Sequence, residues 1–100
     1  MNLVADSDGT LRVTGLDRLS ASNSGDFKQL VLLRLAENVR VVELECAHLR
    51  FIDSDGLGTL ITIHKRLVTC SGRVRLKQPL PVVRQLLRLL RFDEIFEIIP

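Results

Sequence analysis

The sequence predicts a single α/β domain in which helices pack against a small, largely parallel sheet. Segments with alternating apolar and polar residues, as in strands, take turns with segments whose apolar residues recur every three or four positions, as in helices. Strands and helices that alternate in this way form a mixed, mainly parallel sheet. Since 100 residues is the length of one domain, we expect residues 1–100 to share one core.

The chain begins with a predicted β-hairpin. Residues 3–5 and 11–16 carry the apolar positions of two short strands. Residues 6–9, with the sequence Asp-Ser-Asp-Gly, favour a turn because these residue types tolerate a positive φ or bond their own backbone.

A first helix is predicted at residues 22–38 and a central strand at residues 39–46. Residues 21–26 are rich in helix-capping types, and Asp26 suits the positive end of the helix dipole. Apolar residues from Phe27 onward then follow helical spacing. The strand that follows is β-branched and apolar, with Arg and Glu interleaved.

A second helix is predicted at residues 55–70, after a short connection with apolar anchors at residues 48–52. Its apolar stripe includes His64, which we expect in or at the edge of the core rather than as a ligand. Ser71 and Gly72 end the helix, with Gly72 expected in the left-handed conformation that closes many helices.

The remaining elements are a strand at residues 73–77, a helix at 81–91 and a strand at 95–99. Clean alternation indicates the first of these strands, and two prolines separate it from the helix. The complete order is therefore β-β-α-β-α-β-α-β. One face of the last helix carries three basic residues, Arg84, Arg88 and Arg91. We expect this face to be solvated, with contact to an acidic partner surface as the alternative.

The composition excludes several classes of protein. A formal net charge of +2 is too small for a typical nucleic-acid-binding domain, and without Trp or Tyr the chain has few aromatic platforms for bases. The first residues lack the basic and apolar regions of a signal peptide, and no apolar run could span a membrane. We therefore expect a cytoplasmic protein that neither binds nucleic acid nor inserts directly into membranes.

Cysteine and histidine are too few and too scattered for a metal site or a catalytic set. Cys46 and Cys70 lie in apolar surroundings without CxxC spacing, and we expect them to be buried, reduced thiols. His48 and His64 have neither metal-ligand spacing nor a nucleophile–base–acid arrangement around them. We expect no metal, no cofactor and no enzymatic activity.

The segment at residues 51–58 carries the most distinctive chemistry. It lies between predicted β and α structure, where unpaired N–H groups of a helix start favour anions and where Asp53 or Ser54 can cap the helix. Gly56 and Gly58 let another surface approach the backbone. A phosphorylated hydroxyl here would change what docks on the segment, although capping alone also explains the local sequence.

The run FIDSDGLGTLITIHKRL at residues 51–67 resembles the signature of the STAS domain family, in its anti-sigma factor antagonist branch. Residues 15–23 (GLDRLSASN) and 92–98 (FDEIFEI) are similar to the family as well, so the resemblance covers almost the whole chain. It implies a STAS-like fold and a regulatory function in a bacterial partner-switching system. There, an unphosphorylated antagonist binds an anti-sigma factor that is also a GHKL-type serine kinase, and phosphorylation by the kinase breaks the contact.

The resemblance also assigns roles to residues. The family pattern is Asp-Ser-Ser/Thr-Gly-Leu-Gly, and its third position, the usual phosphoacceptor, is Asp55 here. The residues that it places at the partner-binding surface are Asn23, Asp53, Ser54, Asp55, Gly56, Leu57 and Gly58. Leu57 and the two glycines are expected to form a flat docking patch, and the three polar residues before them to set its charge.

Aspartate at position 55 predicts that ordinary phosphoswitching is lost, because it carries one fixed negative charge where a phosphate carries about two. Either the protein is held in a partly phospho-like state with weak affinity for the kinase, or the partner has adapted to Asp55. Ser54 is the alternative phosphoacceptor. We expect it to be a poor one because a helix-capping residue turns its hydroxyl inward.

Two other functions remain as alternatives. Stand-alone STAS-like chains also resemble the soluble subunit of ABC-type lipid transport complexes, in which the partner would be the ATPase. An acidic phosphoacceptor or metal pocket at Asp53 and Asp55 would need an acidic pair at the first strand, but Asp6 and Asp8 lie in a predicted turn.

Overall fold

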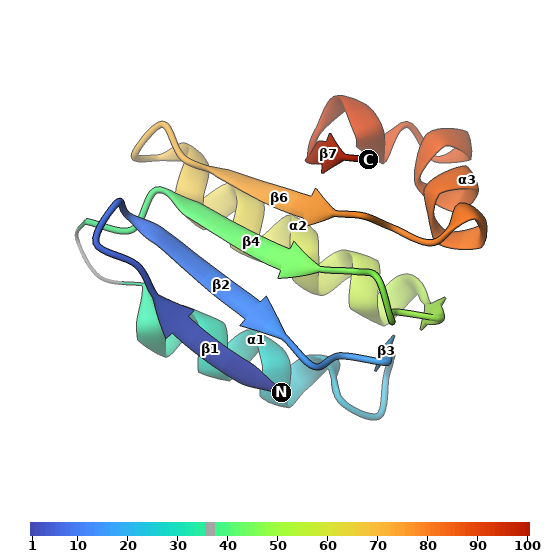
Figure 1. Ribbon diagram of the computed structural model, residues 1–100, viewed down its shortest axis with the longest axis horizontal. Helices are drawn as coiled ribbons and strands as arrows, with labels where there is room; N and C mark the ends of the chain where they lie inside the picture. Colours follow the sequence, from blue (N-terminus) through green and yellow to red (C-terminus); the bar gives the residue numbers. More distant parts are fainter. Residues whose placement is uncertain (36–37) are drawn as a thin grey trace.

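The computed structural model describes residues 1–35 and 38–100, and these residues form one five-stranded mixed sheet with helices packed against it (Figure 1). In spatial order the strands are β1 (Asn2–Ala5), β2 (Thr10–Thr14), β4 (Val41–Glu45), β6 (Arg73–Lys77) and β7 (Glu97–Ile99). β1 and β2 are antiparallel, and every other neighbouring pair is parallel. The predicted fold class is confirmed, with β4 at the centre of the sheet.

The predicted hairpin is confirmed, and its turn depends on Gly9. The backbone of Gly9 has φ +89°, which glycine adopts without strain, and a Cβ there would lie 2.7 Å from the backbone oxygen of Asn38. The N–H of Asp6 closes the turn by donating to the carbonyl of Thr10 at 2.8 Å.

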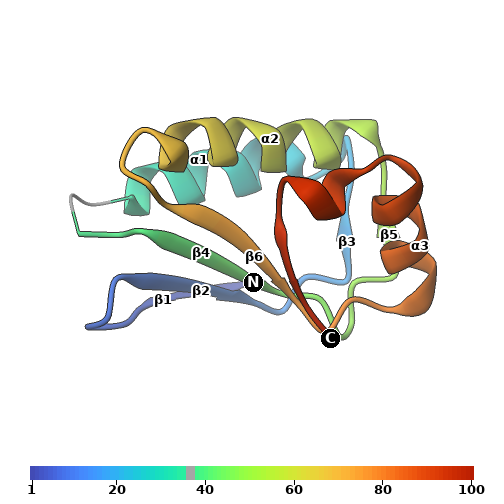
Figure 2. The same ribbon diagram turned by 90° about the horizontal axis from the view of Figure 1, so that it is seen from above.

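Helices α1 (Ser24–Arg34) and α2 (Ser54–Val68) lie together on one face of the sheet (Figure 2). Strand alternation turns one set of apolar side chains toward these helices: Leu11, Val13, Val42, Leu44, Val74 and Leu76. Phe27 of α1 and Leu60 and Ile63 of α2 are fully buried with them in the same cluster. The core therefore lies between this face of the sheet and the two helices.

A second, two-stranded sheet forms where the sequence predicted only a connection. β3 (Arg18–Leu19) pairs in parallel with β5 (Phe51–Ile52). Each strand has two residues, which is too short for an alternating pattern to reveal. This small sheet matters because β5 leads directly into α2.

The predicted ends of the first two helices need correction. α1 begins at Ser24, two residues after the expected start, and ends at Arg34 because Leu35 has extended backbone. The expected extension to residue 38 is wrong for Leu35 and for Asn38, which lies in a turn, while residues 36–37 lie outside the described residues. After α2, the left-handed residue is Ser71, with φ 62°, and not Gly72. Gly72 is needed for space, since a Cβ there would lie 2.2 Å from the carbonyl oxygen of Arg40.

At the C-terminal end, α3 (Pro81–Leu89) is followed by a 3-10 turn, η1 (Phe92–Glu94), and then β7. Both the last helix and the last strand are therefore shorter than predicted. Arg91 has left-handed backbone at φ 60° beyond the end of α3, so the expectation that it shares one helix face with Arg84 and Arg88 is wrong.

His64 is half-buried, and its ring packs edge-on against Phe96 with centroids 6.1 Å apart. This contact joins α2 to the segment before β7. The expectation that His64 lies at the boundary of the core is confirmed.

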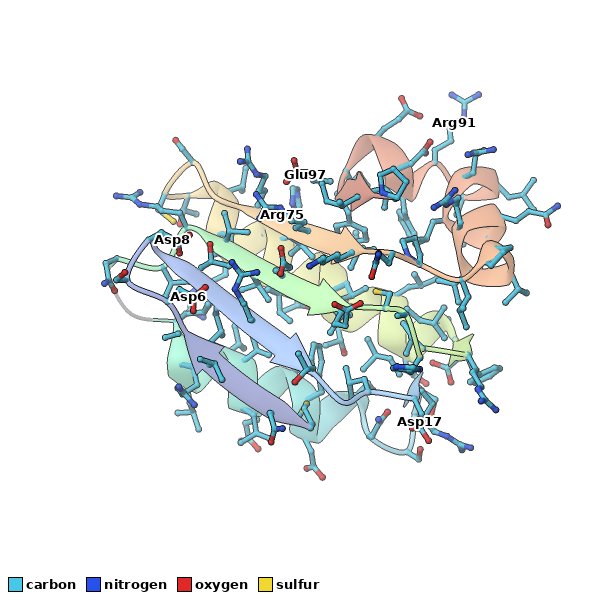
Figure 3. All side chains as sticks on the ribbon, viewed as in Figure 1. Asp6, Asp8, Asp17, Arg75, Arg91 and Glu97 are labelled. Atoms are coloured by element: carbon cyan, nitrogen blue, oxygen red, sulfur yellow. The ribbon has the colours of Figure 1, made fainter. Side chains whose placement is uncertain are left out.

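The helix-free face of the sheet carries a row of charges across four strands. The strand register places Arg12, Glu43, Arg75 and Glu97 side by side. Arg12 pairs with Glu43, and Arg75 pairs with Glu43 at 3.2 Å. Arg75 also pairs with Glu97 at 2.9 Å, and both residues are labelled in Figure 3. We call these four residues the charge ladder.

The two cysteines are free, as expected. Cys46 is buried, and burial raises the pKa of its thiol to about 12, whereas Cys70 is only half-buried, contrary to expectation. Among residues 1–35 and 38–100, no helix combines the length and apolar character needed to cross a membrane.

Candidate functional site

The start of α2 is fixed by the side chain of Asp53. This residue is the N-cap, and its Oδ1 accepts a hydrogen bond from the N–H of Gly56 at 3.0 Å. The Gly56 N–H, which binds the ionised carboxylate, is the main reason that the pKa of Asp53 lies below its usual value. The predicted second helix is confirmed, with α2 beginning at Ser54, one residue before the expected start, and ending at Val68, two residues before the expected end.

The same carboxylate connects α2 to the loop before α1. Asp53 Oδ2 accepts from the N–H of Ala21 at 3.1 Å, and the N–H of Asp53 donates to the carbonyl of Leu19 at 3.2 Å. These bonds join residues 19–21 to the start of α2. Exposed residues of the two segments, among them Ala21, Ser22 and Ser54, therefore belong to one surface.

Asn23, which the resemblance places at the partner-binding surface, lies in that same loop, directly before α1. It occupies the N-cap position of α1 but makes no side-chain cap bond to the helix. Its Oδ1 accepts from the N–H of Ser20 at 2.9 Å, and its Nδ2 donates to the carbonyl of Arg18 at 2.8 Å. Because both ends of the amide bind the backbone of its own loop, Asn23 shapes the surface.

The first turn of α2 divides the predicted site residues into two groups. Ser54, Asp55 and Gly58 are exposed. Gly56 and Leu57 are buried, and Leu57 is only 7% exposed. The expectation that Leu57 and both glycines form a flat outer patch is therefore wrong for Leu57 and Gly56. Consecutive helical residues point about 100° apart, so a contiguous motif cannot face outward as a whole.

Ser54 is more accessible than the sequence suggested. Asp53 provides the cap, and Ser54 is the first residue of the helix, with its side chain exposed. No hydrogen bond of the Ser54 hydroxyl is found in the described part of the chain. The expectation that the hydroxyl of Ser54 turns inward, and that Ser54 is for this reason a poor phosphoacceptor, is therefore wrong.

Phe51, an expected apolar anchor of the connection before α2, is exposed. Its side chain is 54% exposed, whereas that of Ile52 is buried, since neighbouring residues of a strand point to opposite sides. Phe51 also lines a shallow hollow of about 410 Å³ with Asp17, Arg18, His48 and Arg50. The exposure of Phe51 could not be predicted because it follows from the pairing of β5 with β3, which the sequence did not reveal.

No group of three or more His, Cys, Asp or Glu side chains that could hold a metal ion occurs within residues 1–35 and 38–100. The exposed hydroxyl of Ser54 and carboxylate of Asp55 stand at the start of a helix, where backbone N–H groups favour negative charge. This arrangement suits the recognition of, or modification by, another macromolecule.

Comparison with known proteins identifies the family. The model of the STAS domain matches residues 3–100. No curated protein sequence is similar enough to the chain to count as a match.

Solved structures agree with that match at the level of the fold. A putative anti-sigma factor antagonist from Thermotoga maritima superimposes with a TM-score of 0.85 at 24% identity, covering 99% of this chain and 85% of the other. The anti-sigma factor antagonist SpoIIAA in its unphosphorylated form superimposes with a TM-score of 0.70 at 19% identity, covering 88% of this chain and 81% of the other. The phosphorylated form of SpoIIAA, a Bacillus cell fate determinant, superimposes with a TM-score of 0.72 at 19% identity, covering 99% of this chain and 90% of the other.

Proposed function

The chain belongs to the STAS domain family, and from this we propose that it is a regulatory protein that binds an anti-sigma factor with serine kinase activity, as an anti-sigma factor antagonist does. In this proposal residues 1–100 act as one domain, in the cytoplasm, and the protein catalyses no reaction itself. Solved structures with a similar fold include anti-sigma factor antagonists, one of them in both its unphosphorylated and its phosphorylated forms.

One observation carries the proposal: the start of α2 presents Ser54 and Asp55 outward, beside the exposed loop that Asp53 holds in place. A kinase that acts on this segment needs the acceptor position to be exposed, and position 55 is exposed. Asn23 and Asp53 support the surface from below, and Gly58 leaves open space along the helix.

Asp55 gives this surface a fixed negative charge in the first turn of α2. A phosphate at the same position would carry about two negative charges and three acceptor oxygens, so Asp55 reproduces only part of its effect. We propose that binding is governed by this constant charge and that any phosphorylation occurs at Ser54, whose hydroxyl is exposed one residue earlier.

Changing Asp55 tests the proposal. Asp55→Ser should create a phosphoacceptor, seen by mass spectrometry as phosphate on residue 55 after incubation with ATP and the partner kinase recovered from the native host. Asp55→Asn should change affinity for that kinase by about tenfold, because one charge in a binding surface is worth roughly 1–2 kcal/mol. Higher affinity indicates a phospho-like Asp55, and lower affinity indicates a partner adapted to it.

The control is Glu94→Gln, which removes one exposed negative charge from η1 and should leave kinase affinity unchanged. If neither Asp55 variant alters binding and Asp55→Ser is not phosphorylated, the start of α2 is not the interface. Recovery of an ABC ATPase in place of a kinase would replace the proposed function by that of a transport subunit. Phosphate on Ser54 of the wild-type protein would identify it as the acceptor.

A further inference from the structure

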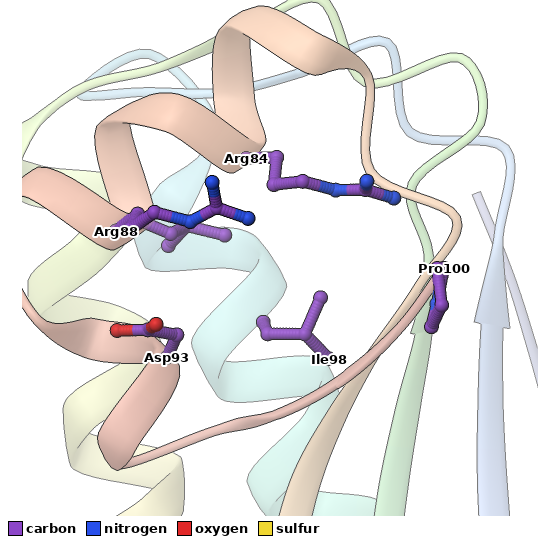
Figure 4. Close-up of a pocket in the computed structure, with 6 residues that line it drawn as sticks. Arg84, Arg88, Asp93, Ile98 and Pro100 are labelled. Atoms are coloured by element: carbon purple, nitrogen blue, oxygen red, sulfur yellow. The ribbon is translucent and has the colours of Figure 1, made fainter.

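A hollow of about 270 Å³ lies between α3 and the C-terminal residues and shares no residue with the site at the start of α2 (Figure 4). Residues of α3, η1 and β7 and the final proline line it: Arg84, Leu87, Arg88, Asp93, Ile98 and Pro100. Its volume is just below the usual range for ligand pockets, which suits a small molecule rather than a large cofactor.

Two guanidinium groups form one wall of this hollow. Arg84 and Arg88 are one helical turn apart on α3, and both side chains extend along the hollow (Figure 4). None of the ion pairs found in the described ranges, 1–35 and 38–100, includes either residue. Two adjacent arginines without a carboxylate partner are suited to bind an oxyanion through paired N–H donors.

The side chain of Arg84 is closed to solvent at its Nε, which is buried and has no hydrogen-bond partner among the described residues. An oxyanion in the hollow therefore has to bind the terminal N–H groups of Arg84, which lines the hollow, and not Nε.

The other walls define the rest of the ligand. Leu87, Ile98 and Pro100 offer apolar contact, while Asp93 places a carboxylate on the far side from Arg84 (Figure 4). A polyanion would be repelled by Asp93. A ligand that fits this lining has a compact anionic group, which binds beside the arginines, and an apolar body, which contacts the apolar residues.

We propose that this hollow binds a small organic anion, with its phosphate or carboxylate group held by Arg84 and Arg88 and its apolar part against Leu87, Ile98 and Pro100. The proposal does not depend on the function proposed for the start of α2, because the two sites share no residue. It assigns Arg84 and Arg88 a ligand-binding role in place of simple solvation.

Titration of the whole protein followed by two-dimensional NMR tests the site with four probes at physiological ionic strength. Phenyl phosphate and benzoate combine an anion with an apolar body, inorganic phosphate has only the anion, and phenol has only the body. At least one aryl anion should give saturable shifts at amides of α3, η1 and β7, with affinity about tenfold above that of inorganic phosphate and phenol. The tighter of the two aryl anions identifies the preferred headgroup. Shifts that do not saturate, or that spread over all basic surfaces, would overturn the proposal.

Variants locate the binding. Arg88→Gln should weaken binding of the aryl anion about tenfold, because it removes one charged pair of donors, and Arg84→Gln should do the same. Asp93→Asn should strengthen binding by removing a repulsive charge. Arg66→Gln, an exposed position on α2, is the matched control and should have no effect.

Arg84 is partly buried, so its variants need an NMR spectrum that shows the fold to be intact. Arg88 is exposed, and Arg88→Gln therefore decides the question if Arg84→Gln does not fold. Binding by Arg88→Gln as tight as that of the wild type, or an equal loss in Arg66→Gln, would contradict the assignment.

Discussion

At the scale of single residues, Asp53 has the largest structural role in the candidate site. One oxygen of its carboxylate caps α2 through Gly56, and the other holds the backbone of Ala21. The sequence predicted that Asp53 or Ser54 caps this helix, because both are preferred N-cap residue types, and Asp53 is the one that does. The bond to Ala21 could not be predicted, since it depends on β3 and β5 pairing beside it.

Acid should remove the contribution of Asp53 to stability. Its pKa is lower in the folded protein than in the unfolded chain, chiefly because the Gly56 N–H binds the charged form. The contribution is therefore complete above the unfolded pKa of about 3.9 and is lost as the pH falls through the lower folded value. Thermal unfolding of wild type and Asp53→Ala should differ by a constant amount above about pH 5, and the difference should narrow below about pH 4.

Asp17→Ala is the control for this measurement, because Asp17 is exposed and the described residues include no hydrogen bond of its carboxylate. A difference between wild type and Asp53→Ala that stays constant down to pH 2 would mean that the stabilisation by Asp53 does not depend on its negative charge.

The outward or inward direction of each site residue was the part of the site that the sequence predicted least well. A motif read as letters treats Asp55, Gly56 and Leu57 as neighbours on one surface. The helix turns Asp55 to solvent and the next two residues into the core. Ser54 was misjudged for a related reason: the cap was assigned to either of two adjacent residues, and only Asp53 occupies it.

At the scale of elements, the close contact between β3 and the first turn of α2 explains Gly56. A Cβ at this position would lie 2.2 Å from the carbonyl oxygen of Leu19, which is backbone and cannot rotate away. The requirement is therefore one of space between two elements. Gly58, two residues farther along the helix, has nothing within 4 Å of its Cβ position.

The two glycines should respond in opposite directions to the same substitution. Gly56→Ala should destabilise the protein by roughly 1–3 kcal/mol, as overpacking of a close contact does. Gly58→Ala should stabilise it by about 0.5–1 kcal/mol, because alanine is the better residue in an exposed helix. Urea unfolding of both variants measures the effect. Equal changes of the same sign would show that β3 does not constrain the start of α2.

Helices and strands long enough to repeat their spacing of apolar residues several times were predicted from the sequence, and the shortest strands were not. The strand at residues 73–77 was predicted with its observed bounds, because apolar and charged residues alternate along its whole length. β3 and β5 contain two residues each and were missed. The end of α1 was also missed, because apolar residues continue past Arg34 after the backbone has left the helix.

At the scale of the whole molecule, the charge ladder spans four strands from β2 to β7. Glu43, at its centre, is the most buried carboxylate of the ladder, with its side chain 10% exposed, and it accepts from both Arg12 and Arg75. The register of β2, β4 and β6 places these three residues opposite one another. The ladder therefore depends on the correct alignment of three strands.

Neutralising Glu43 should destabilise the protein more than removing a charge at the edge of the sheet. Glu43→Gln should cost roughly 1–3 kcal/mol, because two arginines lose their charged acceptor in a partly buried setting. Arg73→Gln removes an exposed partner of Glu97 and should cost less than about 1 kcal/mol. Denaturant unfolding compares the two. A smaller effect for Glu43→Gln than for Arg73→Gln would contradict a central role for Glu43.

The placement of α1 and α2 on one face of the sheet has a consequence for solubility. The opposite face has no helix to cover it and instead carries charged side chains that already have counter-ions within the same molecule. Two molecules that stacked their sheets through this face would have to dehydrate these ion pairs. The exposed apolar side chain that the register places beside Arg12 in this row is Val4 on the edge strand β1. The bare side of the sheet therefore resists aggregation even though it is open to water.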